Sequence, residues 1–251
     1  MTDEPYRWLE AMGNRREYVL DQLREGSPAF AVSLPDGILL LGVGTGTRKV
    51  FEIHDRHAMA ALGHPADLER IRQAAIDAAH LEAFARAAED VSLQRLVGFG
   101  LSAQLKQNFE QLFTAPVLGE FVFAELGVVR EQDLLMRLRF DGSFSVVQQG
   151  VAVVCPRADR EPAVTTWLAG ELRGVTEWTA AARCLLGAWW MMSSGASFTD
   201  GVPAAAEREA GWRGALSGRT LELGWLRRDL VRPARYMALD PGAVLNPIPT
   251  P

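Results

Sequence analysis

The sequence predicts an α+β fold, a four-layer αββα sandwich in which two antiparallel sheets are covered on their outer faces by pairs of helices. Three observations predict it. The stretch from Gly26 to Gly63 contains short apolar segments joined by tight turns, and such short links allow only antiparallel strands. The rest of the chain alternates between strand blocks and pairs of amphipathic helices. Hydrophobic residues make up 48% of the 251 residues, enough for a substantial core.

The first strands follow from their turns and apolar runs. Pro35-Asp36-Gly37 is a turn triplet, because Pro sets φ and Gly accepts positive φ. The aliphatic run from Ile38 to Val43 is typical of a strand that is buried on both faces. The strands predicted in this stretch are Ala29 to Leu34, Ile38 to Val43, Lys49 to Ile53 and His57 to Leu62.

Apolar spacing predicts the remaining elements. A helix from Arg15 to Glu25, capped by Asn14, precedes the first strand, and residues 1–13 are expected to be a polar tail. Residues 193–219 are expected to form a surface loop with a helical turn at 204–210. The other predicted helices are Pro65 to Arg86, Ser92 to Phe113, Asp159 to Leu172 and one from a Thr176 cap to Met192; the other predicted strands are Val117 to Leu126, Leu134 to Phe140, Phe144 to Val147, Val151 to Val154, Thr220 to Arg227 and Ala234 to Leu239.

This order predicts three segments: a tail and helix over residues 1–26, one sandwich domain over 27–240, and a Pro-rich, disordered tail over 241–251. Gly98 and Gly100 interrupt the helix predicted from Ser92, which indicates a kink or close helix packing.

Composition excludes several classes of function. The net charge of -5 and the absence of a basic stripe argue against a nucleic-acid-binding protein. The acidic N-terminus lacks the apolar core of a signal peptide, and no apolar run approaches the ~20 residues of a membrane span, so we expect a cytoplasmic protein. Cys155 and Cys184 lie in apolar contexts and are expected to be buried thiols.

The same stretch resembles the opening of proteasome subunits: a strand, a turn ending in Asp-Gly, an aliphatic strand, a strand beginning with Lys49, a polar turn and a strand ending in Gly63. The segment from Glu17 to Ser27 resembles the lead into the first strand of α-type subunits, not of β-type ones. The resemblance covers about residues 15–240. It implies a bacterial proteasome α-type subunit with the fold of N-terminal nucleophile hydrolases.

The resemblance implies a non-catalytic subunit of a ring. Such a subunit would stack on rings of β-type threonine peptidase subunits, restrict substrate entry and dock an ATPase unfoldase or another activator. Its partners would be like subunits, β-type subunits and activator C-termini, and it would need no cofactor. Glu17 and Tyr18 match the helix that lines the ring surface and carries the gate, although residues 1–13 lack the Tyr-Asp and Pro of other gates.

Lys49 and Gly63 are the site residues that the resemblance implies. α-type subunits carry a lysine at this position in a pocket between neighbouring subunits, where it receives the C-terminal carboxylate of an activator. Gly63 matches the backbone contact of the same pocket. By itself, Lys49 would be interpreted as a solvated lysine at the end of a strand.

An enzymatic alternative uses Ser27. Enzymes of this fold expose a Thr, Ser or Cys as the first residue, and its own α-amine acts as the general base. Alignment of Gly26-Ser27 with their cleavage point places Ser27 at the nucleophile, Lys49 at the lysine and Val43 where β-type peptidases have an Asp. Valine cannot accept a proton, and Pro28 restricts the backbone of Ser27.

Three functions therefore compete: the scaffold subunit, an autoprocessed Ser hydrolase acting on amides, and a diverged relative that assembles without a peptidase partner. A metal site is not expected, because His54, His57 and His64 have no Cys or carboxylate cluster at ligand spacing. The glycines from Gly42 to Gly46 do not form a phosphate loop, since no Gly-Lys-Ser/Thr motif and no helix follow them.

Overall fold

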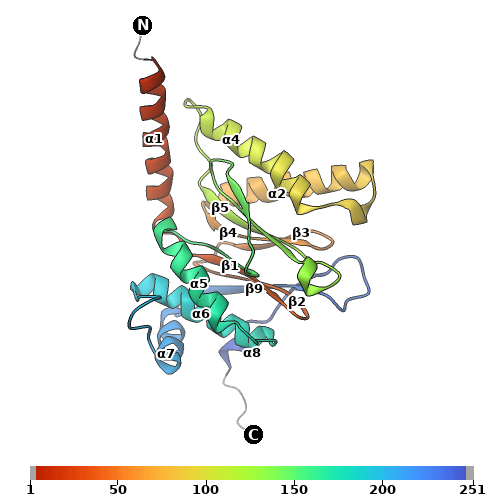
Figure 1. Cartoon of the computed structure of the whole chain (residues 1–251), viewed down its shortest axis with the longest axis vertical. Coiled ribbons are helices and arrows are strands. Elements are labelled where there is room, and N and C mark those ends of the chain that lie inside the picture. The colour runs from red at the N-terminus through yellow and green to blue at the C-terminus, as the bar shows by residue number, and fades with distance from the viewer. Residues whose placement is uncertain (1–3, 247–251) are drawn as a thin grey trace.

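A computed structural model describes residues 4–246 of the chain. Two five-stranded antiparallel sheets lie face to face, with strand orders β10-β9-β2-β1-β8 and β3-β4-β5-β6-β7. Figure 1 shows α2 and α4 on the outer face of one sheet and α5 and α6 on the outer face of the other. The strands are β1 (Ala29–Leu34), β2 (Gly37–Gly44), β3 (Val50–His54), β4 (His57–Gly63), β5 (Gly119–Glu125), β6 (Leu134–Leu138), β7 (Phe144–Val146), β8 (Val151–Val154), β9 (Thr220–Arg227) and β10 (Tyr236–Ala238).

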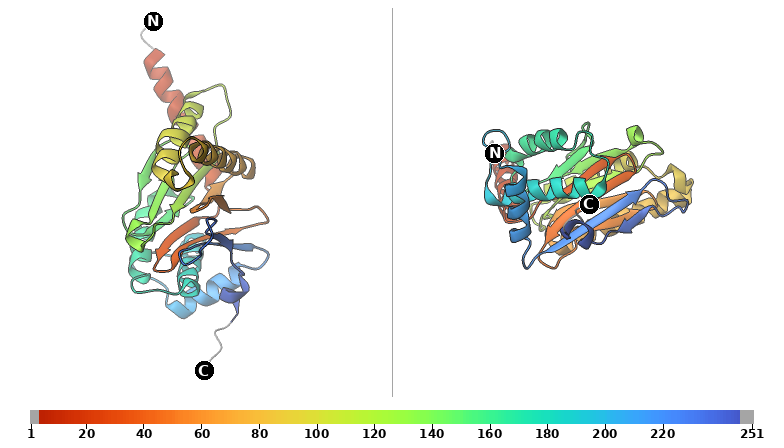
Figure 2. Two further views of the ribbon diagram at one scale, coloured as in Figure 1. Left: turned by 90° about the vertical axis from the view of Figure 1, so that its right-hand side faces the viewer. Right: turned by 90° about the horizontal axis from the view of Figure 1, so that it is seen from below.

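The helices include the predicted pairs. The α-helices are α1 (Glu4–Leu23), α2 (Pro65–Ala85), α3 (Leu93–Arg95), α4 (Ser102–Glu110), α5 (Glu161–Glu171), α6 (Trp178–Ser194), α7 (Ala205–Ala215) and α8 (Gly242–Leu245). A π-helical segment, η2 (Leu96–Leu101), joins α3 to α4, and short 3-10 helices occupy Ala88–Asp90, Arg130–Gln132 and Ala158–Arg160. The αββα sandwich predicted from the sequence is confirmed, and the side view in Figure 2 shows its layers edge-on.

The strand β2 explains why the sequence from Ile38 to Val43 is continuously apolar. Ile38 and Leu40 point into the core between the two sheets, whereas Leu39, Leu41 and Val43 point into the core beneath α6. All eight residues of the strand are buried. A strand covered on both faces has no polar side, so its sequence does not alternate.

The helix α1 begins at Glu4, so the helix predicted from Arg15 was too short, and Asn14 is an interior residue and not its cap. Pro5 is tolerated because it lies in the first turn, where its missing N–H would have no helical partner. Gly13 costs only about 1 kcal/mol relative to alanine and does not end the helix. Figure 1 shows that α1 projects beyond the sandwich. Its first turns pack against no core, so their apolar residues do not follow the helical spacing from which the helix could have been predicted.

Two segments near the C-terminus are more ordered than predicted. The loop expected over residues 193–219 contains α7, whose Trp212 is 1% exposed and packs against the α6 side of the core. The disordered tail expected from 241 begins with α8, where Val244 is fully buried and its carbonyl accepts hydrogen bonds from Arg183. The rest of that tail, residues 247–251, lies outside the described residues.

Smaller corrections concern helix ends. The helix predicted from Ser92 to Phe113 is divided by η2, at Gly98 and Gly100, and ends at Glu110. The α6 helix is preceded by Glu177, not by a Thr176 cap. Across residues 4–246, no helix is both long enough and apolar enough to cross a lipid bilayer.

Candidate functional site

Ser27 lies at the entry to β1, where the turn after α1 joins the sandwich. The turn is closed by a hydrogen bond from the Gly26 N–H to the Leu23 carbonyl, 2.9 Å long. The Ser27 Oγ accepts a hydrogen bond of 2.9 Å from the indole Nε1 of Trp189, which is 1% exposed on α6. The hydroxyl is therefore held against α6, and the backbone of Ser27 is continuous with the helix before it.

Lys49 lies immediately before β3, and its side chain extends to Ser27. Its Nζ donates a hydrogen bond of 2.7 Å to the carbonyl oxygen of Ser27, and the residue is 6% exposed. Two glycines of β2 make room for its side chain. A Cβ at Gly42 would lie 2.9 Å from the Lys49 Cβ, and one at Gly44 would lie 3.6 Å from its Cε. The lysine stem therefore crosses β2 to reach the start of β1.

Burial lowers the pKa of Lys49 to about 8, with the charge of Glu222 opposing this change and that of Arg219 adding to it. Glu222 lies on β9, and its carboxylate accepts backbone hydrogen bonds from Lys49, at 3.0 Å, and from Val50, at 3.1 Å. Val50 is the first residue of β3, an edge strand of its sheet, and Lys49 precedes it, so the carboxylate satisfies two backbone donors where β3 begins. Sequence reasoning missed this role, although Glu222 is a lone carboxylate between apolar strand residues.

Val43 occupies the position where the resemblance to β-type peptidases would require an aspartate. It is fully buried in the core beneath α6. Its side chain has no atom that accepts a proton or orients the lysine. The structure therefore brings Ser27 and Lys49 into contact but provides no carboxylate at the third position of that alignment.

Gly63 ends β4 at the same end of the sandwich. It pairs with Gly119 of β5, and its φ of +151° is unfavourable for residues with a side chain. A Cβ there would lie 2.2 Å from the Leu118 carbonyl oxygen. The absence of a side chain lets the Leu118 carbonyl lie close to the Gly63 backbone. Gly63 lies two residues from Ala61, whose N–H donates to the Lys49 carbonyl.

Glu17 and Tyr18 lie on the solvent side of α1, with Tyr18 50% exposed. The opposite side of the helix packs Val19 and Leu23 against Phe109 and Phe140. An ion pair of 2.8 Å between Arg16 and Asp141 holds α1 to the turn between β6 and β7. The predicted gate residues therefore lie on the exposed side of α1, the helix that projects beyond the sandwich in Figure 1.

The histidines singled out in the sequence have other roles. Within residues 4–246, no group of three or more His, Cys, Asp or Glu side chains is arranged to hold a metal ion. The Nδ1 of His64 accepts the Ala66 N–H and caps α2. His57 is fully buried, with its Nε2 3.5 Å from a carboxylate oxygen of Glu125. His54 lies beside His80, with ring centroids 5.6 Å apart.

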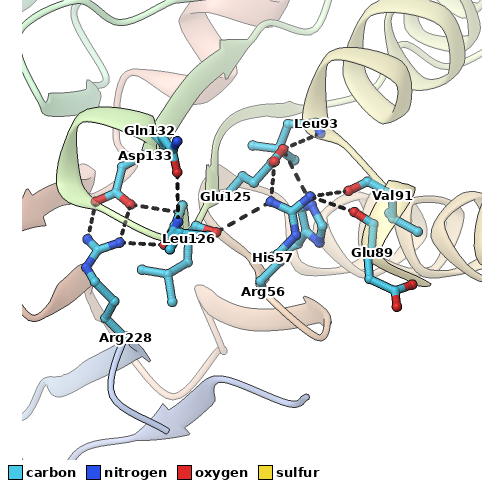
Figure 3. A network of polar contacts seen from close by, with 12 residues as sticks. Arg56, His57, Glu89, Val91, Leu93, Glu125, Leu126, Gln132, Asp133 and Arg228 are labelled. Carbon is cyan, nitrogen blue, oxygen red and sulfur yellow. Dashed lines mark hydrogen bonds and ion pairs between the residues drawn. The ribbon is translucent and has the colours of Figure 1, made fainter. Parts of the chain in front are cut away.

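A buried ion pair at the opposite end of β1 was not predicted. Asp133, whose side chain is 1% exposed, accepts hydrogen bonds from both terminal nitrogens of Arg228, at 3.0 and 2.8 Å. It also accepts the Ser33 hydroxyl, at 2.8 Å, and the Gly127 N–H, at 2.9 Å. Figure 3 shows the pair beside the loop after β5. It connects β1, the β5–β6 loop and the end of β9, and so joins the two sheets.

A second network, centred on Glu125, lies nearby in Figure 3. Its carboxylate pairs with Arg56 and accepts the Leu93 N–H at 2.7 Å. Arg56 also donates to the carbonyls of Val91, at 2.8 Å, and Glu89, at 3.2 Å. Burial raises the pKa of Glu125, but the His57 imidazole, the Leu93 N–H and the Arg56 guanidinium outweigh burial and lower it to about 2. The network ties the loop before α3 to the second sheet.

Comparisons with known proteins agree with this architecture. No family model matches the chain. Among curated proteins, a proteasome subunit alpha of Paenarthrobacter aurescens is 33% identical over 153 residues, which cover 57% of this chain and 63% of the relative. A proteasome subunit alpha of Pseudarthrobacter chlorophenolicus is 30% identical over 156 residues, which cover 60% of this chain and 64% of the relative.

A proteasome subunit alpha of Actinosynnema mirum is also 30% identical, over 139 residues. The chain matches less than two thirds of the length of the first two relatives, 63% and 64%. The matching sequence, the two stacked sheets and the helix joined to β1 nevertheless agree with one another. Over somewhat more than half of its length, the chain is similar in sequence to bacterial proteasome α-type subunits, and its two stacked sheets are consistent with their fold.

Proposed function

We propose that this chain is a non-catalytic ring subunit of a bacterial proteasome core particle, acting in the cytoplasm. It scaffolds rings of β-type threonine peptidase subunits, restricts substrate entry and docks an ATPase or another activator. The proposal treats residues 27–240 as the sandwich domain and the preceding helix as a retained part of the subunit. The curated relatives are named only as proteasome alpha subunits, so each of these activities is inferred for this chain.

The side chain at position 43 carries the proposal. The alignment with β-type peptidases has an aspartate at this position, whereas Val43 is fully buried in the core beneath α6 and has no atom that accepts a proton. In the uncleaved chain the Nζ of Lys49 donates to the Ser27 carbonyl, and the Ser27 nitrogen is an amide, which cannot act as a general base.

The helix α1 supports a role in assembly. It is anchored to the sandwich by Val19 and Leu23, and its outer turns expose Trp8 by 45% and Leu9 by 67%. Exposed aromatic and aliphatic residues on a projecting helix are typical of a surface that a protein partner covers. Neighbouring subunits of a ring would provide such a partner.

The first test is the mass of the purified chain and its partners. We expect an intact mass that still includes residues 1–26, no turnover of peptides, and co-purification with a β-type subunit when the two are co-expressed.

The contact between Lys49 and Ser27 also favours the Ser hydrolase alternative, because self-cleavage after Gly26 would place a free amine beside Lys49. A mature chain that begins with Ser27 and cleaves amides would refute the scaffold proposal, and rings that form without a β-type partner would favour the diverged relative.

The second test concerns activator docking at Lys49 and Gly63. We expect Lys49→Ala to leave ring assembly intact and to weaken activator binding by about tenfold or more, because a charge-assisted hydrogen bond to a carboxylate is lost. The measurement is the affinity of assembled rings for the activator. Lys106, the only other lysine of the chain, provides a matched control: its side chain is 67% exposed on α4. Equal affinity in the Lys49→Ala and Lys106→Ala rings would refute the docking role.

A further inference from the structure

A cavity of about 640 Å³ lies where the turn between β1 and β2, the start of α6 and the strands β9 and β10 meet. Ser27, Lys49 and Gly63 do not line it, so it is separate from the entry to β1. Apolar side chains, two of them tryptophans, form part of its wall: Trp178, Trp225, Met237 and Leu239.

The indole ring of Trp225 is one of these walls. The residue is 5% exposed, and its ring lies against the turn between β1 and β2, where a Cβ at Gly37 would lie 2.9 Å from its Cζ2. Within residues 4–246 its Nε1 donates no hydrogen bond, unlike the Nε1 of Trp189, which bonds Ser27. Buried indole N–H groups usually have a partner, so this donor is available to an acceptor in the cavity.

Trp178, the first residue of α6, is the second aromatic wall. It is half-buried and packs on the same core cluster as Trp225. Among aromatic side chains, tryptophan attracts a cation most strongly, because the face of its ring carries partial negative charge. Two such rings at one cavity favour a ligand that is flat and positively charged.

The two arginines that line the cavity are already bound to carboxylates. Arg227 donates two hydrogen bonds to Asp229, and Arg228 donates two to the buried Asp133. Their positive charge is therefore balanced within the chain.

Two further carboxylates line the cavity and have no such partner. Asp36, in the turn between β1 and β2, and Glu177, immediately before α6, are exposed, and in the described part of the chain neither side chain makes a hydrogen bond or an ion pair. The hydrogen bonds and charge of Asp229, with a smaller effect of Asp36, raise the pKa of Arg227, so one guanidinium faces both aspartates. The cavity therefore keeps a surplus of negative charge beside its aromatic walls.

We propose that this cavity binds the guanidinium group of an arginine side chain that a partner polypeptide presents. A guanidinium is planar, stacks on aromatic faces and is more weakly hydrated than an ammonium, so it suits Trp178. Asp36 and Glu177 accept its N–H groups, and the Nε1 of Trp225 donates to a backbone carbonyl of the partner.

The volume of the cavity agrees with such a ligand. It lies within the range of roughly 300–1,000 Å³ that ligand-binding cavities occupy, and it leaves room for the backbone on either side of the arginine. The site is additional to docking at Lys49 and does not depend on ring assembly.

The experiment measures saturation transfer from the purified full-length chain to N-acetylargininamide and, separately, to N-acetylcitrullinamide. Citrulline has nearly the shape of arginine but carries no charge. We expect the arginine compound to bind about tenfold more tightly or better, because citrulline loses the attraction to both the carboxylates and the indole face. Free arginine should bind no more tightly than N-acetylargininamide, since its own carboxylate is repelled by Asp36 and Glu177.

Two variants locate the site, each with a matched control. Trp178→Leu should weaken binding of N-acetylargininamide by about fivefold or more, whereas Trp8→Leu, at an exposed tryptophan outside the cavity, should leave it unchanged. Glu177→Gln should weaken it by about two- to fivefold, because an exposed charge contributes less. Its control is Glu207→Gln, at an exposed position on α7 that does not line the cavity.

Thermal melting of the four variants shows whether they are folded. If Trp178→Leu is unfolded, Glu177→Gln still tests the site, because it replaces only an exposed side chain. Equal binding of the arginine and citrulline compounds, no saturation of either, or equal affinities in Glu177→Gln and Glu207→Gln would overturn the proposal. Tighter binding of free arginine than of N-acetylargininamide would overturn the assignment to a polypeptide side chain.

Discussion

Replacing Asp133 with alanine is expected to lower the free energy of unfolding by about 3–5 kcal/mol, the usual effect of removing one partner from a buried ion pair. Asp133 is 1% exposed at its side chain and Arg228 is 16% exposed. The substitution leaves a guanidinium largely out of water and frees the Ser33 hydroxyl and the Gly127 N–H from their acceptor. Urea denaturation at neutral pH would measure the change.

The neighbouring pair Arg227–Asp229 provides the control. Its two hydrogen bonds, of 2.5 and 2.7 Å, are shorter than those of the buried pair, but the side chains are 44% and 64% exposed. Asp229→Ala should therefore shift the denaturation midpoint very little. If Asp133→Ala and Asp229→Ala have the same small effect, the Asp133–Arg228 pair does not hold the sheets together.

Glu125 is expected to make the fold sensitive to acid. Its pKa is lowered from 4.5 to about 2 in the folded chain. The unfolded chain therefore binds a proton more readily, and the stabilisation by Glu125 is fully present above pH 4.5 and is lost as the pH falls towards about 2. The difference between the two pKa values corresponds to about 3 kcal/mol.

Denaturation curves at several pH values from 7 to 3 would test this, comparing the wild type with Glu125→Gln. The variant should be less stable at neutral pH and should lose less stability on acidification. Glu110→Gln, at an exposed position on α4, is the control and should follow the wild type. Burial raises the pKa of Glu120, so that residue acts with the opposite sign, and the difference between wild type and Glu125→Gln isolates Glu125. If the free energy of unfolding falls equally with pH in the wild type and in Glu125→Gln, the Glu125 network does not determine acid stability.

Local patterns identified most of the strands because each depends on neighbours in the sequence. The turn at Pro35-Asp36-Gly37 needs only its own residues, and the buried run of β2 reflects cover on both faces. The spacing of apolar residues did not predict helical segments that are buried on one side only or not at all. In α7, Trp212 is the only fully buried residue, and at the start of α1 the exposed Trp8 and Leu9 pack against no core element.

The site was predicted only in part. The resemblance implied Lys49 and Gly63 as docking residues and Ser27 as the nucleophile of the enzymatic alternative. The structure places all three at one end of the sandwich, and their roles stay predictions. The contact of the lysine with the Ser27 carbonyl and the role of Glu222 at the start of β3 were not predicted. Each depends on side chains from elements that are distant in the sequence.

The sequence by itself determined the order of strands and helices, and with it the two covered sheets, because alternation and helical spacing are properties of adjacent residues. Only the tertiary structure decided which charged groups meet. Lys49 and Glu222 are 173 residues apart, and Asp133 and Arg228 are 95 apart. No periodic pattern extends over such separations; the partners are selected by how the two sheets stack.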